Sequence, residues 1–310
     1  MKAYGITARD TQPAHLDLTQ PEPAPGEILV KVEAASVNGF DLSVAAGYVW
    51  DMLPHEFPVV LGRDLVGTVT AVGDGVDQFR VGDRVAGVIP GMNLGSRTGS
   101  FADYVALPAT AVTGVPEGLE AAAAAVIGLA GIAAHDALGA LDVQPGDTVL
   151  ISGATGGVGS IATQLATAAG ATVIATARPG QEEEYVRRLG AAHTVDYTGD
   201  PAAAVRGLAA DGVDHALHLA GDAAAVGQAV RRGGSVATTL GATAEQIGRN
   251  DVKVAGIMAA ATPEKLAALL EHVAAGQLSV NVEARVPLDH AHEALSLFAD
   301  GTLGKVLITR

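Results

Sequence analysis

Apolar and polar positions alternate along two stretches of the first third of the chain. Residues 26–37, "GEILVKVEAASV", and residues 58–88 are rich in Val and follow this alternation. The second stretch is interrupted by Gly73-Asp74 and Gly82-Asp83. Gly-Asp pairs between alternating segments are typical of turns, so the pattern predicts short antiparallel strands and a first third that is mostly β.

From about Glu117 the pattern changes to Ala-rich helical segments that alternate with short apolar runs. Such alternation predicts a parallel sheet covered on both faces. The predicted helices are 121–141, 159–170, 182–190, 223–233, 263–276 and 289–301. The predicted strands are 148–153, 172–177, 193–197, 214–220, 234–241, 251–259, 282–288 and 305–310. The crossing between the two patterns is "PATAVTGVPEGLE", which predicts a domain boundary there.

Composition limits the classes of function. The chain has 310 residues, no cysteine and a formal net charge of −15. A strongly acidic surface disfavours nucleic acid and anionic membranes as partners, and the lack of cysteine excludes zinc sites built on thiolates. The sequence has no long apolar run free of charge or glycine, and its first residues do not resemble a secretory signal. We therefore expect no membrane partner and a cytoplasmic location.

One glycine-rich stretch has the form of a phosphate-binding turn. Ala154-Thr155-Gly156-Gly157-Val158-Gly159 fits A-x-G-x-x-G and lies directly between a predicted strand and a predicted helix. Backbone N–H groups at that place can meet a pyrophosphate. Gly156 would allow a close approach of the phosphate, Gly159 would let helix pack on strand, and Ala154 is tolerable if it needs no positive φ. The alternative is a tight turn that binds nothing.

The end of the next strand bears on the choice of nucleotide. An NAD site places a carboxylate about 20 residues downstream to hold the ribose 2′-hydroxyl. Here the sequence reads Ala175-Thr176-Ala177-Arg178-Pro179, and the first carboxylate is Glu182. Arg178 and Thr176 suit a 2′-phosphate, so we expect NADPH as the cofactor. The alternative is that Arg178 only caps a loop.

Ordered motifs along nearly the whole chain resemble one family. They are "VKVEAASVNGFDL" at 30–42, "PVVLGRDLVGTVTAVGDGVDQFRVGDRV" at 58–85, "GSFADYVALP" at 99–108, "GATGGVGSIATQLATAAGATVIATA" at 153–177 and "GTLGKVLIT" at 301–309. The chain is similar to the zinc-independent quinone oxidoreductases of the medium-chain dehydrogenase/reductase superfamily, the group that includes zeta-crystallin. The resemblance implies an α/β fold with a GroES-like β-rich catalytic domain (1–117 and 261–310) and an inserted Rossmann domain (118–260).

The resemblance also concerns the metal. Zinc-dependent relatives carry a Cys in the first motif and Gly-His-Glu in the second, whereas this chain has Asn38-Gly39-Phe40-Asp41 and Gly62-Arg63-Asp64. We therefore expect no metal, and without zinc the reversible oxidation of alcohols is disfavoured. Hydride transfer to a quinone or to an α,β-unsaturated carbonyl compound (an enone) is the expected reaction.

Site residues follow from the same resemblance. Asn38 and Asp41 are expected at the nicotinamide end, and Tyr48 as a substrate wall able to donate its O–H, although it can equally pack a loop beside Trp50. Further cofactor contacts are expected from Ala154 to Gly159 and from Thr176, Arg178, Tyr197, Ala220, Leu240, Gly241 and Lys305. Two departures weaken this set: the family's usual Lys after the second strand is absent, and "HLAGDAA" replaces the commoner Val-Gly-Gly.

Three functions stay open on the sequence. The first is an NADPH-dependent quinone or enone reductase, and the second is a ketone or enoyl reductase for a bulky polyketide-like intermediate, which the long aromatic segment "VAAGYVWDMLPHEF" suggests. The third is a crystallin-like protein that binds NADPH without turnover. The strand at 251–259 is expected at the edge of the sheet, where relatives pair across a two-fold axis, so a homodimer is expected.

Overall fold

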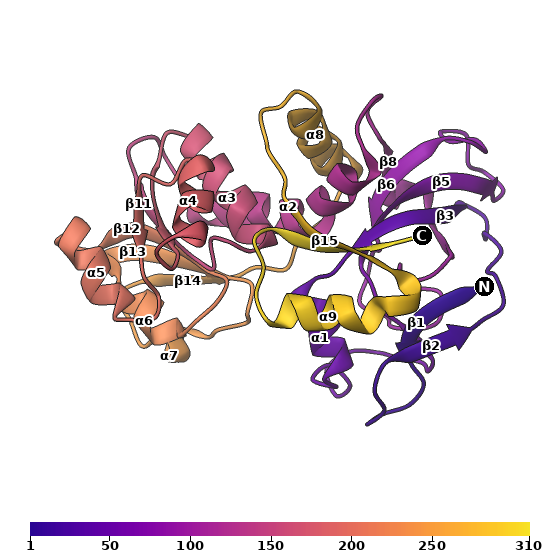
Figure 1. Cartoon of the computed structure of the whole chain (residues 1–310), viewed down its shortest axis with the longest axis horizontal. Helices are drawn as coiled ribbons and strands as arrows, with labels where there is room; N and C mark the ends of the chain where they lie inside the picture. Colours follow the sequence, from indigo (N-terminus) through magenta and orange to yellow (C-terminus); the bar gives the residue numbers. More distant parts are fainter. The chain divides into compact units, whose positions relative to one another are not determined.

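The computed structural model describes residues 1–310, which divide into two compact units (Figure 1). Unit 1 comprises Met1–Leu129 and Ala261–Arg310, and unit 2 comprises Ala130–Ala260. The two ends of the chain therefore build one unit, with the other inserted between them. The first division falls inside a helix, α2 (Ala121–Leu141), whereas the expected boundary at 117/118 lies ahead of it.

Unit 1 is built mainly from antiparallel strands, as the alternation predicts. A seven-stranded sheet has the order β15-β16-β3-β5-β6-β8, with β7 paired to β3 off this path, and a three-stranded sheet has the order β2-β1-β4. The strands are β1 Lys2–Ile6, β2 Ala14–Asp17, β3 Glu27–Ser36, β4 Val59–Val60, β5 Asp64–Val72, β6 Arg84–Val88, β7 Tyr104–Pro108, β8 Val112–Gly114, β15 Val282–Pro287 and β16 Lys305–Thr309. The turns at Gly73 and Gly82 donate backbone N–H bonds to Glu27 and Val69, which closes the neighbouring strands.

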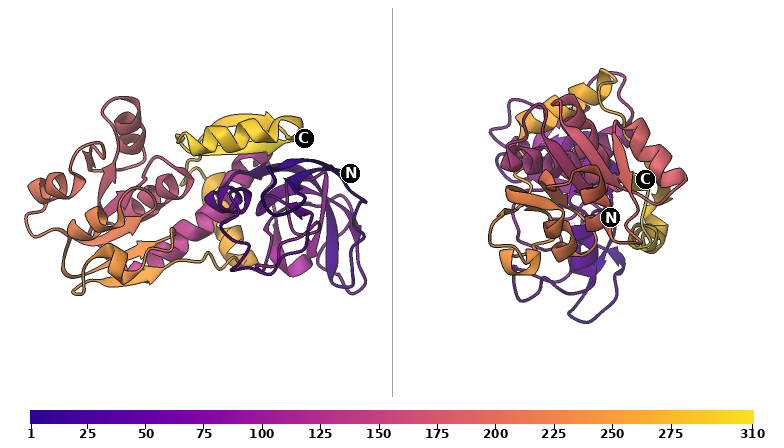
Figure 2. Two further views of the ribbon diagram at one scale, coloured as in Figure 1. Left: turned by 90° about the horizontal axis from the view of Figure 1, so that it is seen from below. Right: turned by 90° about the vertical axis from the view of Figure 1, so that its left-hand side faces the viewer.

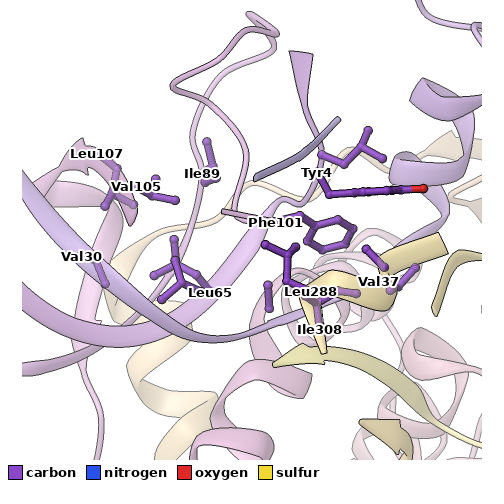
Figure 3. Packing of buried hydrophobic residues seen from close by; sticks show 14 of the residues in the cluster. Tyr4, Val30, Val37, Leu65, Ile89, Phe101, Val105, Leu107, Leu288 and Ile308 are labelled. Atoms are coloured by element: carbon purple, nitrogen blue, oxygen red, sulfur yellow. The ribbon is translucent and has the colours of Figure 1, made fainter. Parts of the chain in front are cut away.

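The hydrophobic core of unit 1 collects side chains from elements far apart in the sequence. Figure 3 shows Phe101 beside Tyr4 of β1, with Leu288 and Ile308 from the C-terminal segment close by. Phe101 is fully buried. Burial of this apolar surface is the main force that holds the two chain ends together.

The C-terminal segment supplies two strands and two helices to unit 1. The helices are α8 Pro263–Ala274 and α9 Ala291–Ala299, and a 3-10 turn at Leu288–His290 precedes α9. Strand β16 pairs antiparallel to β3, with Leu307 opposite Ser36. Figure 2 shows this yellow segment lying against the indigo N-terminal part of the unit. The pairing brings the first residue of β16, Lys305, to the end of β3.

Unit 2 is a parallel six-stranded sheet in the order β11-β10-β9-β12-β13-β14, the order of a doubly wound fold. Strands and helices alternate as the sequence pattern predicts. The strands are β9 Thr148–Ser152, β10 Thr172–Thr176, β11 His193–Val195, β12 Val213–His218, β13 Val230–Thr238 and β14 Lys253–Gly256. The helices are α3 Gly157–Ala168, α4 Gln181–Arg188, α5 Pro201–Leu208, α6 Ala223–Gln228 and α7 Ala244–Ile247.

One predicted helix is too long. The expected helix 223–233 ends at Gln228, because Val230 is buried and pairs with Val213 as the first residue of β13. The pairing of β12 and β13 then shifts register before Ser235, so residues that read as helix form the irregular start of a strand. Strands β1 and β2, helix α5 and the short helices α1 (Gly39–Ala45) and α7 are further elements that the pattern did not predict.

Helix α2 is long and apolar enough to cross a membrane by length and composition, and 61% of its most apolar 18-residue window is buried inside the protein. Helices in the core of a folded domain can have the same length and composition. The helix is kinked at Gly128, where φ is −44° and ψ is −109°. A Cβ at Gly128 would lie 2.7 Å from the Cβ of Asp64, so the absence of a side chain lets the helix approach β5.

Candidate functional site

The phosphate-type turn of unit 2 joins β9 to α3. Helix α3 follows its N-cap residue Gly156, and its first internal hydrogen bond runs from Ser160 N to Gly156 O. The N–H groups of Gly157, Val158 and Gly159 therefore precede that first bond, at the positive end of the helix dipole. This is the arrangement that a pyrophosphate needs.

The backbone of the turn explains why glycine stands at some of its positions and alanine at another. A Cβ at Gly159 would lie 2.2 Å from Gly153 O, so only glycine lets the helix start there. At Gly156 the nearest atom to a Cβ is Gly153 O, 3.6 Å away, which leaves its surface open. Gly153 takes the positive φ of +72°, whereas buried Ala154 does not need one. The replacement of the first fingerprint glycine by alanine is thereby explained. Thr155 is half-buried in the same turn.

Residues that follow β12 and β13 lie at the same edge of the parallel sheet as this turn. Ala220 is exposed, and its Cβ would lie 3.0 Å from a Cβ at Gly153. Leu240 is exposed and donates its N–H to Thr238 Oγ1, and Gly241 follows with φ of +69°. The ends of parallel strands are the usual place for ligands in such sheets, so these three residues lie on the expected edge.

Thr176 has a structural partner. It is the last residue of β10, it is 5% exposed, and its Oγ1 accepts a 2.9 Å hydrogen bond from Gly153 N. The threonine therefore ties the end of one strand to the phosphate turn of its neighbour. This contact was not anticipated from the sequence.

Arg178 lies in a three-membered cluster with Glu182 and Tyr197, which we call the Arg178 cluster. Its Nε donates to Glu182 Oε1 at 2.7 Å, and its guanidinium carbon lies 5.9 Å from the centre of the Tyr197 ring. The Tyr197 hydroxyl donates to the same Glu182 oxygen at 3.2 Å. Of the residues expected around the 2′-phosphate, Arg178 and Tyr197 are thus brought together with the carboxylate of Glu182, whereas Thr176 bonds the phosphate-type turn instead.

A second polar group is buried in unit 1, between the end of β3, helix α1, the start of β5 and the start of β16. We call it the Lys305 cluster; its members are Ser36, Asn38, Asp41, Asp64 and Lys305, all at most 7% exposed. Asp41 accepts hydrogen bonds from Asn38 N at 2.8 Å and from Gly62 N at 2.9 Å. The first bond closes the N-terminus of α1, and the second holds the Asp41 carboxylate against the turn before β5.

The Asp64 carboxylate accepts four hydrogen bonds in the Lys305 cluster. It accepts from Ser36 N and Ser36 Oγ, both at 2.7 Å, and from Asn38 Nδ2 at 3.2 Å. A fourth bond comes from Leu129 N at 3.2 Å, directly after the kink of α2. The kink therefore has a polar consequence, because it turns a backbone donor of the helix toward this carboxylate.

Lys305 is the cation at the centre of the cluster. It is 2% exposed, and its ammonium donates to Val37 O and Asn38 Oδ1, each at 2.6 Å. Asn38 therefore connects the lysine to Asp64, with its oxygen bound to one and its nitrogen to the other. The expected sites Asn38, Asp41 and Lys305 lie in one hydrogen-bonded group.

Burial perturbs the titration of this cluster. Desolvation raises the pKa of Asp41 to about 7, while the N–H of Asn38 opposes the rise and the neighbouring charge of Asp64 adds to it. Burial also lowers the pKa of Lys305, and the charges of Asp64 and Asp41 act against that change. Perturbed groups of this kind gather at functional sites, although structural ion-pair networks produce them too.

The residues at the positions of the family's zinc ligands do not fit a zinc ion. Zn²⁺ takes three or four Cys, His or carboxylate ligands, and no cluster of His, Asp and Glu in the structure could hold a metal. The Lys305 ammonium stands among the two carboxylates, and the oxygens of Asp41 and Asp64 already accept from backbone and side-chain donors. A dication would have to displace these donors beside a resident cation.

Arg63 is a further functional candidate. The sequence pointed to it only as part of the motif in which zinc-dependent relatives carry a metal ligand. It is 7% exposed, its Nη2 donates to Ile89 O at 2.8 Å, and its guanidinium lies 5.4 Å from the ring of Phe40. Its Nη1 is buried without a hydrogen-bond partner, as is Ser100 Oγ. Unpaired buried donors are costly, and the sequence signal that marks this one is a charged residue between two apolar strand segments.

The side chains of Tyr48 and Trp50 differ in their exposure to solvent. Tyr48 is 75% exposed, whereas Trp50 is 7% exposed and contacts the rings of His55 and Phe57 at 5.1 and 5.2 Å. The tyrosine is therefore not packed into the aromatic group beside it. His55 belongs to that aromatic group, and its Nδ1 forms a hydrogen bond with Leu53 O.

Two family models match the chain. The alcohol dehydrogenase GroES-like domain matches residues 24–117, and the zinc-binding dehydrogenase model matches residues 157–275. The chain is 37% identical over 194 residues to a zinc-type alcohol dehydrogenase-like protein of Schizosaccharomyces pombe, covering 57% of this chain and 55% of that protein. It is 28% identical to a chloroplast envelope quinone oxidoreductase homolog of Arabidopsis thaliana, covering 95% and 93%.

A partial match and two solved structures complete the comparison. A mycocerosic acid synthase-like polyketide synthase of Mycobacterium tuberculosis is 41% identical over 56% of this chain, which is 8% of the synthase. An NAD-dependent alcohol dehydrogenase superposes with a TM-score of 0.88 at 30% identity, and each chain is covered completely. A mycobacterial protein complexed with NADPH superposes with a TM-score of 0.87 at 29% identity, again over both whole chains.

Proposed function

Since the chain belongs to the medium-chain dehydrogenase/reductase superfamily and is quinone oxidoreductase-like, we propose that it is a zinc-independent reductase that uses NADPH to reduce quinones or enones. Oxidoreductase activity with a nicotinamide cofactor is supported by the family. The finer points, which are the phosphorylated cofactor and the class of acceptor, are our proposal.

The Lys305 cluster carries the choice of acceptor. The stretches that correspond to the metal-ligand motifs of zinc-dependent relatives contribute Asn38, Asp41 and Asp64 to this cluster. The oxygens of the two carboxylates already accept hydrogen bonds, and Asn38 and Val37 hold the ammonium of Lys305. That set offers no Lewis acid to activate an alcohol or an isolated ketone. Quinones and enones are electrophilic without one, and they suit an enzyme of this composition.

The cofactor fits unit 2. The turn from Ala154 to Gly159 presents open N–H groups for the pyrophosphate. Arg178 and Tyr197 supply a cation and a hydroxyl for a 2′-phosphate, and both are bound to Glu182 in the structure. Thr176 acts by holding the turn, and Ala220, Leu240 and Gly241 form the adjoining edge. When bound, the reduced nicotinamide supplies a hydride to the acceptor.

The remaining tasks fall to residues of unit 1. Reduction of an enone puts negative charge on its carbonyl oxygen, and reduction of a quinone makes a hydroquinone anion, so each product needs a donor and then a proton. We assign the donor role to the exposed Tyr48 hydroxyl and a positioning role to Asn38, Asp41 and Lys305, which form one buried hydrogen-bonded group.

The test is consumption of NADPH, followed by its absorbance, with matched panels of quinones, enones and simple ketones. We expect turnover with quinones or enones and at least tenfold slower turnover with ketones. Tyr48→Phe should lower kcat while leaving the KM for NADPH unchanged. Tight binding of NADPH without turnover of any acceptor would favour a crystallin-like protein that only binds the cofactor.

A second candidate is an enoyl reductase for a polyketide-like intermediate. The 41% identity to a part of a mycobacterial polyketide synthase, which amounts to 8% of that protein, favours it. Activity confined to long acyl thioesters with a 2,3 double bond, and none on free quinones, would make this the function.

We also propose a homodimer in the cytoplasm. Strand β14 is at the end of the six-stranded sheet, so its outer edge is available for pairing with a second copy. Exposed Met258 lies two residues after the end of that strand. Sedimentation at micromolar concentration should give twice the mass of the chain, and a monomer would contradict the proposal.

A further inference from the structure

We propose that Glu182 sets the cofactor preference of this protein, because it occupies Arg178 and thereby weakens binding of NADPH relative to NADH. This inference rests on the proposed function, in which Arg178 meets the 2′-phosphate. Glu182 was seen in the sequence only as the first carboxylate after the second strand.

Glu182 engages Arg178 through both of its oxygens. Its Oε2 accepts from the backbone N–H of Arg178 at 2.8 Å, and its Oε1 accepts from Arg178 Nε at 2.7 Å. Arg178 Nη2 lies 2.5 Å from the same Oε1. The Nε and Nη2 edge of the guanidinium, one of the edges that bind a phosphate in two-pronged fashion, is therefore already filled.

The carboxylate is seated more firmly than the cation that it binds. The Glu182 side chain is 13% exposed, whereas that of Arg178 is 61% exposed. Tyr197 adds a third donor to Glu182 Oε1 at 3.2 Å. Partial burial alone would raise the pKa of Glu182, but the hydrogen bonds from Arg178 outweigh it and lower that pKa, so the group is ionised at neutral pH.

The two cofactors meet this arrangement differently. The 2′-phosphate of NADPH brings about −1.5 to −2 charges at neutral pH, so it must compete with Glu182 for Arg178 and stand near a second anion. The 2′-hydroxyl of NADH is neutral and can donate to the Glu182 carboxylate, which is how acidic residues hold NAD ribose in such folds. Glu182 therefore opposes one cofactor and assists the other.

The decisive variant is Glu182→Gln, because it removes the charge and keeps the size of the side chain. We expect its Kd for NADPH to fall about tenfold and its Kd for NADH to stay equal or rise, measured by fluorescence titration of the full chain. Because the effect is electrostatic, the gain for NADPH should shrink as salt is raised from about 0.05 to 0.5 M. Glu182→Ala should shift the preference in the same direction.

The matched control is Glu183→Gln. Glu183 is the adjacent residue in the first turn of α4 and forms an i,i+4 ion pair with Arg187, at 2.8 Å. This variant changes the net charge and the helix terminus by the same amount, away from Arg178. Its ratio of Kd values for the two cofactors should stay within about twofold of wild type, well under a tenfold change.

The outcomes separate this inference from the proposed function. If wild type prefers NADPH, Arg178→Gln removes that preference, and Glu182→Gln leaves the ratio unchanged, the inference is wrong and the function stands. An equal shift in Glu183→Gln also overturns it, since bulk charge would then be the cause. If Arg178→Gln leaves NADPH binding unchanged, the assignment of the phosphate to Arg178 fails and this inference fails with it, whereas the proposed function still stands or falls by the consumption of NADPH with quinones or enones.

Discussion

The two charged clusters of this protein differ in their burial and in how far apart in the sequence their members lie. The Lys305 cluster is buried, its members come from four separate elements, and its cation is at most 2% exposed. The Arg178 cluster is on the surface, its ion pair is four residues apart on one turn of chain, and its cation is mostly exposed. Each contains one cation and at least one carboxylate, yet the energetic consequences of disturbing them differ greatly.

The difference follows from the cost of taking charge out of water. A buried ion left without its partner is destabilising by several kcal/mol, whereas an exposed pair contributes about 0–1 kcal/mol and can open. The Lys305 cluster is therefore suited to hold a fixed arrangement behind a reacting group. The Arg178 cluster is suited to exchange one anion for another, which is what recognition of a cofactor requires.

The largest expected effect is that of Lys305→Met. Removal of the ammonium leaves Asp41 and Asp64 buried without a cation, and we expect a loss of about 3–5 kcal/mol in the free energy of unfolding, measured with urea. The control is Lys253→Met, at an exposed position of β14. A loss of less than about 1 kcal/mol at Lys305 would show that the buried cluster behaves like a surface pair.

The second-largest effect concerns the kink of α2, which directs the N–H of Leu129 to Asp64 in the Lys305 cluster. Gly128→Ala puts a Cβ 2.7 Å from the Cβ of Asp64, and we expect overpacking of about 1–3 kcal/mol by urea denaturation. Gly139→Ala lies in the same helix with nothing within 4 Å of its Cβ, and it should stabilise by about 0.5–1 kcal/mol. If both variants behave alike, the contact with Asp64 is not what requires glycine.

The third prediction uses pH. Because burial raises the pKa of Asp41 to about 7, the folded protein holds this proton to higher pH than the unfolded chain, whose carboxyl titrates near 4. Unfolding then releases a proton between about pH 4 and 7, and this group lowers the unfolding free energy by up to about 1.4 kcal/mol per pH unit as pH rises. Asp41→Asn should lack that component.

The measurement is the difference in unfolding free energy between wild type and variant across that range. The exposed Asp77→Asn serves as the control and should keep the wild-type slope. Parallel curves for wild type and Asp41→Asn would mean that the carboxylate is ionised throughout, held by the N–H groups of Asn38 and Gly62.

The smallest effect on stability is expected at the surface. Arg178→Gln should leave the denaturation midpoint unchanged, because the pair is open to solvent, and should raise the Kd for NADPH about tenfold. Arg187→Gln breaks the neighbouring pair with Glu183 and should change neither quantity. A clear loss of stability at Arg178 would remove the contrast between the two clusters.

Much of the fold could be predicted from local pattern. Alternation predicts β3 and β5, and the change to helical periodicity predicts the parallel sheet with its phosphate-type turn. The pattern failed at residues 229–233, where a buried Val230 pairs with Val213 although the local sequence reads as helix. Tertiary pairing there overrides propensity, as it commonly does in short segments.

The same division holds for the candidate sites. Spacing alone identifies the turn from Ala154 to Gly159 and places Arg178 after β10, because both depend on neighbours within a few residues. The bond between Lys305 and Asn38 joins positions 267 apart, and the donor from Leu129 to Asp64 exists only because α2 kinks at a glycine.

The sequence by itself determined the alternation of strands and helices, the glycine pattern of the turn and the absence of thiolate ligands. Only the tertiary structure decided which charges are buried together and that Glu182 closes on Arg178. The physical reason is that periodicity and turn chemistry act over a few residues, whereas the pairing of buried charges depends on how distant strands dock and on the water that their docking removes.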